Sequence, residues 1–311
     1  MFENLIENLK KKNVRTISKL ISFIENENNN YLKHLSKIHP LTGKAWRIGI
    51  TGPPGSGKST LTNHLIKKII KNNESVAVIA IDPSSPFNGG SILGDRIRFS
   101  NTTKDSNIFF RSMSTRGSQG GLSKSSSMVA DIFDAAGFDN IIFETVGVGQ
   151  VEVDVIEAAD TVMVTLVPES GDDIQMMKSG LMEIADLYII NKSDRDGSDR
   201  LYNSLNKILE LNKKLNWNPK IIKTSAINGD GIDDLFAQMI SHKSYLKKNE
   251  IKSIKFDERY LKSVKDFISK DLNQRFWNKN KNIMKKIENE IQLKIKDRMS
   301  PYDIAKKLLK K

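Results

Sequence analysis

Short, continuous apolar runs recur along the middle of the chain, and stretches with helical spacing lie between several of them. The runs cover residues 47–51, 76–81, 140–143, 161–167, 187–190 and 220–223. A strand inside a parallel sheet is buried on both faces, so its sequence is apolar throughout rather than alternating. The pattern therefore predicts an α/β fold with a doubly wound, mostly parallel sheet.

Both ends of the chain show helical spacing instead. Near the N-terminus the apolar positions with this spacing are Ile17, Leu20, Ile21 and Ile24, followed by Tyr31, Leu32 and Leu35. The polar run 25–30 predicts a break between these two groups. Residues 39–43 contain proline and glycine and mark the boundary with the sheet.

The tail has two apolar faces of its own. One comprises Tyr260, Leu261, Val264, Phe267, Ile268 and Leu272, and the other comprises Ile283, Ile287, Ile291 and Ile295. Ser300, Pro301 and Asp303 predict the start of a last helix, because they suit its cap, first position and first turn. We expect a helical extension over 1–44, the α/β domain over 45–243 and a helical arm over 244–311.

The charge is uneven along the 311 residues, whose formal net charge is +12. Residues 1–243 hold 29 Lys and Arg against 28 Asp and Glu, whereas residues 244–311 hold 20 against 9. No aromatic-interleaved basic motif accompanies the tail, so we interpret it as a solvated arm and expect no nucleic-acid partner. A nucleic-acid-binding arm is the alternative reading of the same charge.

Composition excludes several classes of site. The chain has no cysteine, which rules out disulfides, thiolate metal sites and cysteine nucleophiles, and its four histidines are scattered. No apolar run approaches the roughly 20 residues that span a bilayer, and the N-terminus is acidic where a targeting peptide would be basic. We expect a cytoplasmic protein without a membrane partner.

A complete Walker A motif follows the first strand and opens a helix. Its glycines let backbone N–H groups surround the β-phosphate, Lys58 neutralises the β- and γ-phosphates, and the Ser59 hydroxyl ligates Mg²⁺. The predicted phosphate-binding residues are Gly52, Pro53, Pro54, Gly55, Ser56, Gly57, Lys58, Ser59 and Thr60. Lys58 is also a candidate catalytic residue, because it would stabilise the transferring phosphoryl group.

The sequence Asn-Lys-Ser-Asp follows a later strand of the same domain. A carboxylate at Asp194 can accept from both N1–H and the exocyclic amino group of guanine, whereas adenine offers neither donor on that edge. Thr224, Ser225 and Ala226 follow the next strand and predict a second base-contacting loop. The predicted base-binding residues are Asn191, Lys192, Asp194, Ser225, Ala226 and Ile227.

Glu144 closes another strand and begins a Glu-Thr-Val-Gly sequence. This is the position of the Asp-x-x-Gly motif of GTPases, where the carboxylate would hold Mg²⁺ through water and the N–H of Gly147 would sense the γ-phosphate. Glu144 and Gly147 are therefore candidate catalytic residues alongside Lys58. A plain strand-end carboxylate is the alternative for Glu144. Val148 stands where a glutamine orients the attacking water in Ras-like proteins, and the nearest glutamine is Gln150. We infer slow intrinsic hydrolysis that a partner accelerates.

Further loop residues are candidates on position alone. Asp82 and Asp95 could reach the metal or its waters from loops beyond the strand ends, although loop carboxylates are common. Arg116 begins a glycine-rich stretch and could stabilise charge, or could be an ordinary surface arginine.

Taken together, these residues resemble the MeaB/ArgK family of P-loop GTPases, which belongs to the SIMIBI class. The segments that carry the resemblance are 48–52, 82–86, 89–95, 116–117, 120–122, 135–139, 144–150, 169–172, 191–194 and 300–305. The resemblance extends over residues 14–243 and, loosely, over the last dozen.

The resemblance implies a function that the spacing of residues alone cannot indicate. Members are GTPase chaperones of adenosylcobalamin-dependent methylmalonyl-CoA mutase, which gate cofactor loading and protect the enzyme. They form homodimers through the C-terminal arm, and nothing in the resemblance places cobalamin on the chaperone itself. Loops matching 82–95, 144–150 and 171–178 act as switches. By that resemblance Arg116, Gln150, Asp172 and Lys178 are switch candidates, and GTP or GDP with Mg²⁺ is the bound ligand.

Two other classes of GTP-dependent protein fit parts of the sequence. A metallochaperone-like GTPase shares the fold, but such proteins usually carry His and Cys residues for metal delivery, whereas this chain has no Cys and its His residues are scattered. A nucleotide-dependent kinase linked to amino-acid transport is the other alternative, although we find no phosphoacceptor site.

Overall fold

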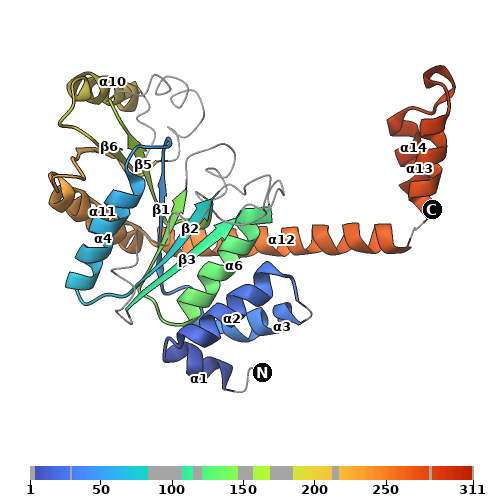
Figure 1. The fold of residues 1–311 in the computed structure, drawn as a ribbon, viewed down its shortest axis with the longest axis horizontal. Helices are drawn as coiled ribbons and strands as arrows, with labels where there is room; N and C mark the ends of the chain where they lie inside the picture. The colour runs from blue at the N-terminus through green and yellow to red at the C-terminus, as the bar shows by residue number, and fades with distance from the viewer. Residues whose placement is uncertain are drawn as a thin grey trace. The chain divides into compact units, whose positions relative to one another are not determined.

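A sheet of seven strands forms the centre of the computed structural model (Figure 1). The structure describes residues 4–28, 30–82, 107–114, 121–145, 157–168, 185–211, 217–279 and 282–309. The strands are β1 (Trp46–Thr51), β2 (Val76–Asp82), β3 (Ile108–Ser114), β4 (Asn140–Thr145), β5 (Thr161–Leu166), β6 (Leu187–Ile190) and β7 (Lys220–Lys223). They lie in the order β3-β2-β4-β1-β5-β6-β7, and every pairing between them is parallel. The predicted parallel α/β sheet is confirmed.

The edge strand β3 is the one that the apolar runs did not predict. Phe109 and Met113 on it are buried, whereas Phe110 and Arg111 are half-buried. An edge strand has a neighbour on one side only, so its sequence can mix polar and apolar residues. Its Ile-Phe-Phe run is the only strand signal that it offers.

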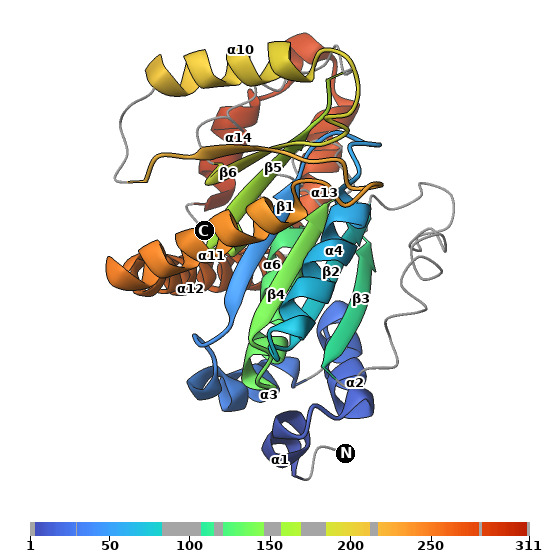
Figure 2. The same ribbon diagram turned by 90° about the vertical axis from the view of Figure 1, so that its left-hand side faces the viewer.

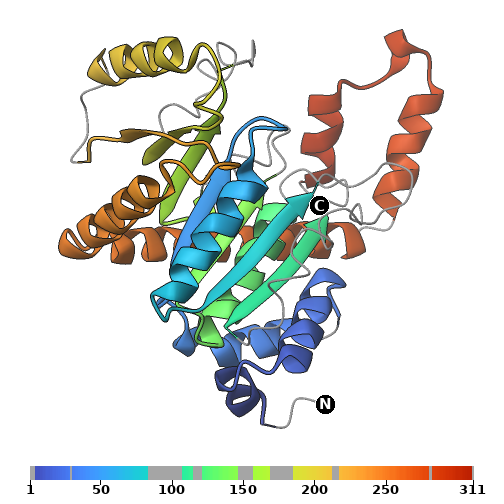
Figure 3. The same cartoon turned by 60° about the vertical axis from the view of Figure 1, so that its left-hand side comes forward.

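Helices cover both faces of the sheet. Figures 2 and 3 show α4 (Lys58–Lys71) in front of the sheet and α6 (Gly121–Ala135) behind it. Alternate residues of β6 divide between two cores, because successive side chains of a strand point to opposite faces. Leu187 and Ile189 pack with α4 and α11 (Ile232–Lys248), while Tyr188 and Ile190 pack with α10 (Ser198–Leu211).

Three N-terminal helices precede the sheet; the second and third pack against α6, and the first packs against the second. They are α1 (Leu5–Lys10), α2 (Val14–Glu25) and α3 (Tyr31–Ile38), followed by a 3₁₀ turn over His39–Leu41. The predicted break after Glu25 is confirmed. Just before β1, the backbone N–H groups of residues 43–45 donate to the Asp134 carboxylate at 2.8–3.0 Å. This carboxylate fixes the junction between the helical extension and the sheet.

The chain divides into two compact units, residues 1–256 and residues 257–311. The boundary that we expected after residue 243 falls inside α11, which continues to Lys248 because His242 and Leu246 on its inner side are buried. The division itself lies within α12 (Ile251–Lys279). We find no helix among the described residues with the length and apolar character that a bilayer span requires.

The second unit continues with α13 (Asn282–Gln292), a 3₁₀ turn over Ile295–Asp297 and α14 (Pro301–Leu309). The predicted start of the last helix is confirmed, since Ser300 Oγ accepts from the Asp303 N–H at 3.1 Å. The prediction that Ile283, Ile287, Ile291 and Ile295 form one helical face is wrong, because Ile295 lies beyond the end of α13 and is 84% exposed. Arg298 donates to the carbonyls of Ile291 and Leu293, which supplies partners to the end of that helix.

A polar cluster lies where the strands begin, and we call Trp46, Thr161, Asp186, Trp217 and His242 the amino-edge cluster; Asp186 and Trp217 are half-buried and the other three are buried. The Thr161 hydroxyl accepts from Trp46 Nε1 and lies next to His242 Nδ1, each at 2.9 Å. Trp217 Nε1 donates to the Asp186 carbonyl at 2.9 Å, and its ring centroid is 4.6 Å from that of His242. Burial lowers the pKa of His242 to about 4, so the imidazole is neutral at pH 7.

Candidate functional site

The loop between β1 and α4 has a backbone that only glycine fits at two places. Gly52 has φ 143° and Gly57 has φ 89°, both in the region that side chains disfavour. A Cβ at Gly52 would collide with the carbonyl oxygen of Thr165 on β5, and one at Gly57 would collide with the side-chain amide of Asn191. The two glycines therefore let the loop lie directly against its neighbours.

The start of α4 is arranged to receive an anion. Gly57 caps the helix without a side-chain hydrogen bond, and its first turn contains no acidic residue. The first N–H groups of a helix lack partners within it and attract phosphate. The Lys58 ammonium lies buried in the same loop, where it donates to the carbonyls of Gly52 at 2.7 Å and Pro53 at 2.8 Å. Positive charge and N–H donors thus meet at one end of α4.

Glu144 reaches the same loop from the neighbouring strand. β4 pairs with β1 so that Glu144 lies opposite Ile50, one residue before the end of β1. The Ser59 hydroxyl donates to the Glu144 carboxylate, which is almost completely buried. The structure therefore brings together a hydroxyl and a carboxylate, two oxygen ligands of the kind that Mg²⁺ prefers.

Asn191 joins the loop at the phosphate end to the loop predicted for the base. Its Nδ2 donates to the Ser56 carbonyl at 2.8 Å. Its Oδ1 accepts from the Thr224 hydroxyl at 3.1 Å and from the Ala226 N–H at 3.0 Å. All three amide contacts are made inside the protein, so Asn191 fixes the spacing between the two loops rather than projecting toward a ligand.

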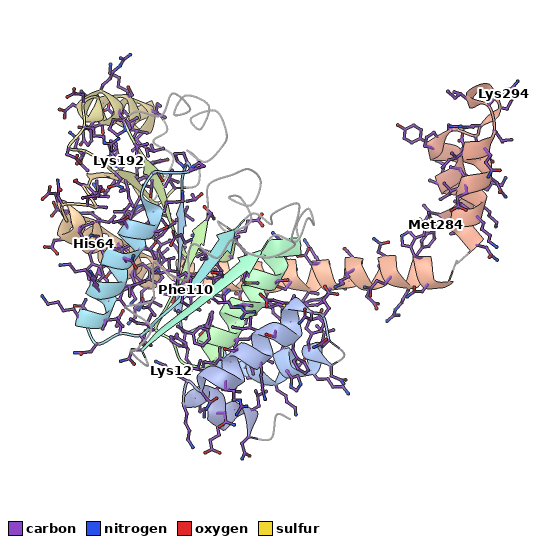
Figure 4. All side chains as sticks on the ribbon, viewed as in Figure 1. Lys12, His64, Phe110, Lys192, Met284 and Lys294 are labelled. Atoms are coloured by element: carbon purple, nitrogen blue, oxygen red, sulfur yellow. The ribbon has the colours of Figure 1, made fainter. Side chains whose placement is uncertain are left out.

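Asp194 is exposed at the carboxyl end of β6, close to the 225–227 loop. A hydrogen bond from the Ser225 hydroxyl holds the pKa of Asp194 below its usual range, so the side chain is a carboxylate at neutral pH. Ser225 is fixed in turn, since its N–H donates to the Asp230 carbonyl at 3.1 Å. Lys192, labelled in Figure 4, precedes Asp194 by two residues and has φ 57°, and Ile227 is 84% exposed.

Several predicted residues lie outside the described part of the chain. These are Asp95, Arg116, Gly147, Gln150, Asp172 and Lys178, together with the side chain of Asp82. Among the residues that the structure does describe, no three His, Cys, Asp or Glu side chains gather as a metal cluster. Sequence reasoning also missed His64, whose ring contacts Ala226.

Comparison with known proteins adds to this geometry. The family model described as "Methylmalonyl Co-A mutase-associated GTPase MeaB" matches residues 17–281. A protein of Pyrococcus horikoshii whose name places it among GTPases is 43% identical over 99% of this chain and 98% of its own length. GTPase ArgK of Escherichia coli is 39% identical over 68% of this chain and 66% of its own length.

A solved structure has the same fold along nearly the whole chain. It is titled "Crystal structure of LAO/AO transport system kinase" and superimposes with a TM-score of 0.73, covering 98% of this chain and 95% of that one. Its sequence identity is 24%, so the likeness bears on the fold alone.

Proposed function

Because this chain belongs to the family of methylmalonyl-CoA mutase-associated GTPases, we propose that it is the GTPase chaperone of an adenosylcobalamin-dependent mutase. It hydrolyses GTP to GDP and phosphate. The observation that carries the proposal is the family match over residues 17–281, which includes both nucleotide loops and all of α12. Methylmalonyl-CoA mutase is the client that we favour.

The residues of the two loops have distinct proposed roles in this reaction. Lys58 and the N–H groups at the start of α4 hold the β- and γ-phosphates and stabilise the charge that develops during transfer. Asp194 accepts from the guanine edge, and residues 225–227 border the base. Asn191 keeps the phosphate and base sites at a fixed spacing through Ser56 and Ala226.

We propose that Mg²⁺ is the metal of the site, with the Ser59 hydroxyl as a ligand and the Glu144 carboxylate holding the ion through water. The donor set fits, since both groups are hard oxygen ligands and they already touch each other. Bound Mg²⁺ would neutralise charge on the β- and γ-phosphates. Asp82 and Asp95 remain candidates for the outer ligands. A site with few protein ligands suits this ion, which keeps several waters and takes phosphate oxygens as ligands.

The partner proposals concern the loops and the tail. Gly147, Arg116, Gln150, Asp172 and Lys178 are proposed switch residues that respond to the nucleotide and to the client. The arm is proposed to carry a homodimer contact. In the described structure, α12 bears apolar side chains that are largely exposed on this chain, namely Tyr260, Leu261, Ile268 and Leu272.

Adding methylmalonyl-CoA mutase is expected to raise kcat for GTP hydrolysis by on the order of 10-fold or more, because a partner can complete a site that lacks a water-positioning residue. The measurement is steady-state phosphate release at increasing mutase concentration. An unrelated acyl-CoA enzyme at equal concentration is the control for a non-specific protein effect.

Two outcomes would count against this proposal. A turnover rate that does not respond to the mutase would rule out the mutase as the partner, while leaving the assignment of GTPase activity intact. Incubation with γ-labelled GTP separates hydrolysis from the kinase alternative: label transferred to a protein, in place of released phosphate, would favour a kinase.

A further inference from the structure

One side chain on α4 reaches across to the loop that borders the base. His64 Nε2 lies 2.8 Å from the carbonyl oxygen of Ala226, and Figure 4 shows His64 on α4. A carbonyl oxygen can only accept a hydrogen bond, so Nε2 must carry the proton and donate. His64 stands six positions after Lys58 on the same helix. The helix that begins at the phosphate end therefore also holds the loop at the base end.

Ala226 is held from two sides. Its N–H donates to Asn191 at 3.0 Å and its carbonyl accepts from His64 at 2.8 Å. The peptide groups on both sides of Ala226 therefore have fixed orientations. The next residue, Ile227, is 84% exposed, so packing does not restrain its side chain. Beyond it the loop turns back on Ser225, whose carbonyl accepts from the N–H groups of Gly229 at 2.8 Å and Asp230 at 3.2 Å. The hydrogen bond from His64 ties this loop, at Ala226, to α4.

We propose that His64 is a positioning residue for guanine recognition. It fixes the Ala226 peptide, which keeps the Ser225 hydroxyl within reach of Asp194 and holds that carboxylate toward the base. The inference rests on the proposed guanine-reading role of Asp194 and residues 225–227. His64 does not touch the nucleotide in this scheme and acts through the loop alone.

The test replaces His64 by Leu, which removes the donor, and by Gln, whose amide can donate again. His64→Leu is expected to raise KM for GTP and the rate of mant-GDP dissociation roughly 3- to 10-fold, with kcat changed by less than about twofold. His64→Gln is expected to restore most of both values. The preference for GTP over ATP should fall in the Leu variant by the same factor as the affinity for GTP.

Lys68→Ala is the matched control. Lys68 lies one turn further along α4 and forms an ion pair with Asp233 on α11, so its loss also removes a link between α4 and the segment after the loop. It does not contact Ala226. Its KM and mant-GDP dissociation rate should stay near the wild-type values.

The possible results distinguish failure of the positioning role of His64 from failure of the guanine-reading role of Asp194. Unchanged KM for GTP and unchanged mant-GDP dissociation in His64→Leu would overturn the positioning role. Equal losses of affinity for GTP and ATP together with a lowered Tm would also overturn it, because they indicate a general folding role. If the Leu variant does not fold, His64→Asn, whose amide is too short to reach Ala226, answers the same question. Asp194→Asn is measured alongside: if it alters base selectivity while His64→Leu does not, only the inference fails. If neither does, the base site is misassigned.

Discussion

Replacing Lys58 with alanine is expected to lower kcat for GTP hydrolysis by at least about 100-fold, since charge stabilisation is the main contribution to phosphoryl transfer. The ammonium lies buried within the loop between β1 and α4, where neighbouring carbonyls orient it. Alanine would leave the backbone N–H groups of the loop in place but remove the only cation that the described part of the loop provides. Phosphate release under saturating GTP is the measurement.

Lys67→Ala is the control for this variant. Lys67 is exposed on the same helix, so its removal changes the net charge equally without touching the loop. Its kcat should remain near the wild-type value. Turnover by Lys58→Ala at a comparable rate would show that the phosphate site lies elsewhere, and the assignment of the loop would then be abandoned.

Replacing Asp194 with asparagine is expected to weaken GTP binding by roughly 100-fold or more and to shift preference toward xanthosine triphosphate. Guanine presents two donors on the edge that a carboxylate can accept, whereas an amide offers one acceptor and one donor group. Xanthine replaces the exocyclic amino group by a carbonyl, which the amide nitrogen can bind. Calorimetric titration with both triphosphates measures the selectivity.

An adjacent carboxylate provides the comparison. Asp196 is exposed in the same segment, and Asp196→Asn removes the same charge two residues further on. The ratio of GTP to xanthosine triphosphate affinity in Asp196→Asn should match that of the wild-type protein. If Asp194→Asn keeps the original ratio of GTP to xanthosine triphosphate affinity, then the carboxylate does not read the base.

The central sheet could be predicted from the sequence because most of its strands are buried on both faces. Residues 76–81 and 187–190 are apolar without interruption for that reason. β3 has a neighbour on one side only, and its half-buried Arg111 and Ser112 break the apolar signal. The end of α13 could not be predicted either, because Arg298, which lies beyond the helix, donates to the carbonyls of Ile291 and Leu293.

The candidate site was predictable only as far as its motifs are local. The loop after β1 and the Asn-Lys-Ser-Asp segment each contain their own signal within a few residues. The link between them depends on Asn191 and Ser56, which are 135 positions apart, and on His64 and Ala226, which are 162 apart. Contacts at such separations leave no pattern in a single sequence, and a lone histidine on a helix has no distinguishing neighbours.

The amino-edge cluster has a practical consequence for optical measurements. The chain has three tryptophans: Trp46 and Trp217 lie in this cluster, and Trp277 belongs to the second unit. A six-residue strand such as β1 is about 20 Å long, so Trp46 at its start is far from the loop that follows its end. A change in the emission of Trp46 or Trp217 on adding GTP would therefore report a rearrangement carried through the sheet, since the nucleotide itself would be too distant to quench them.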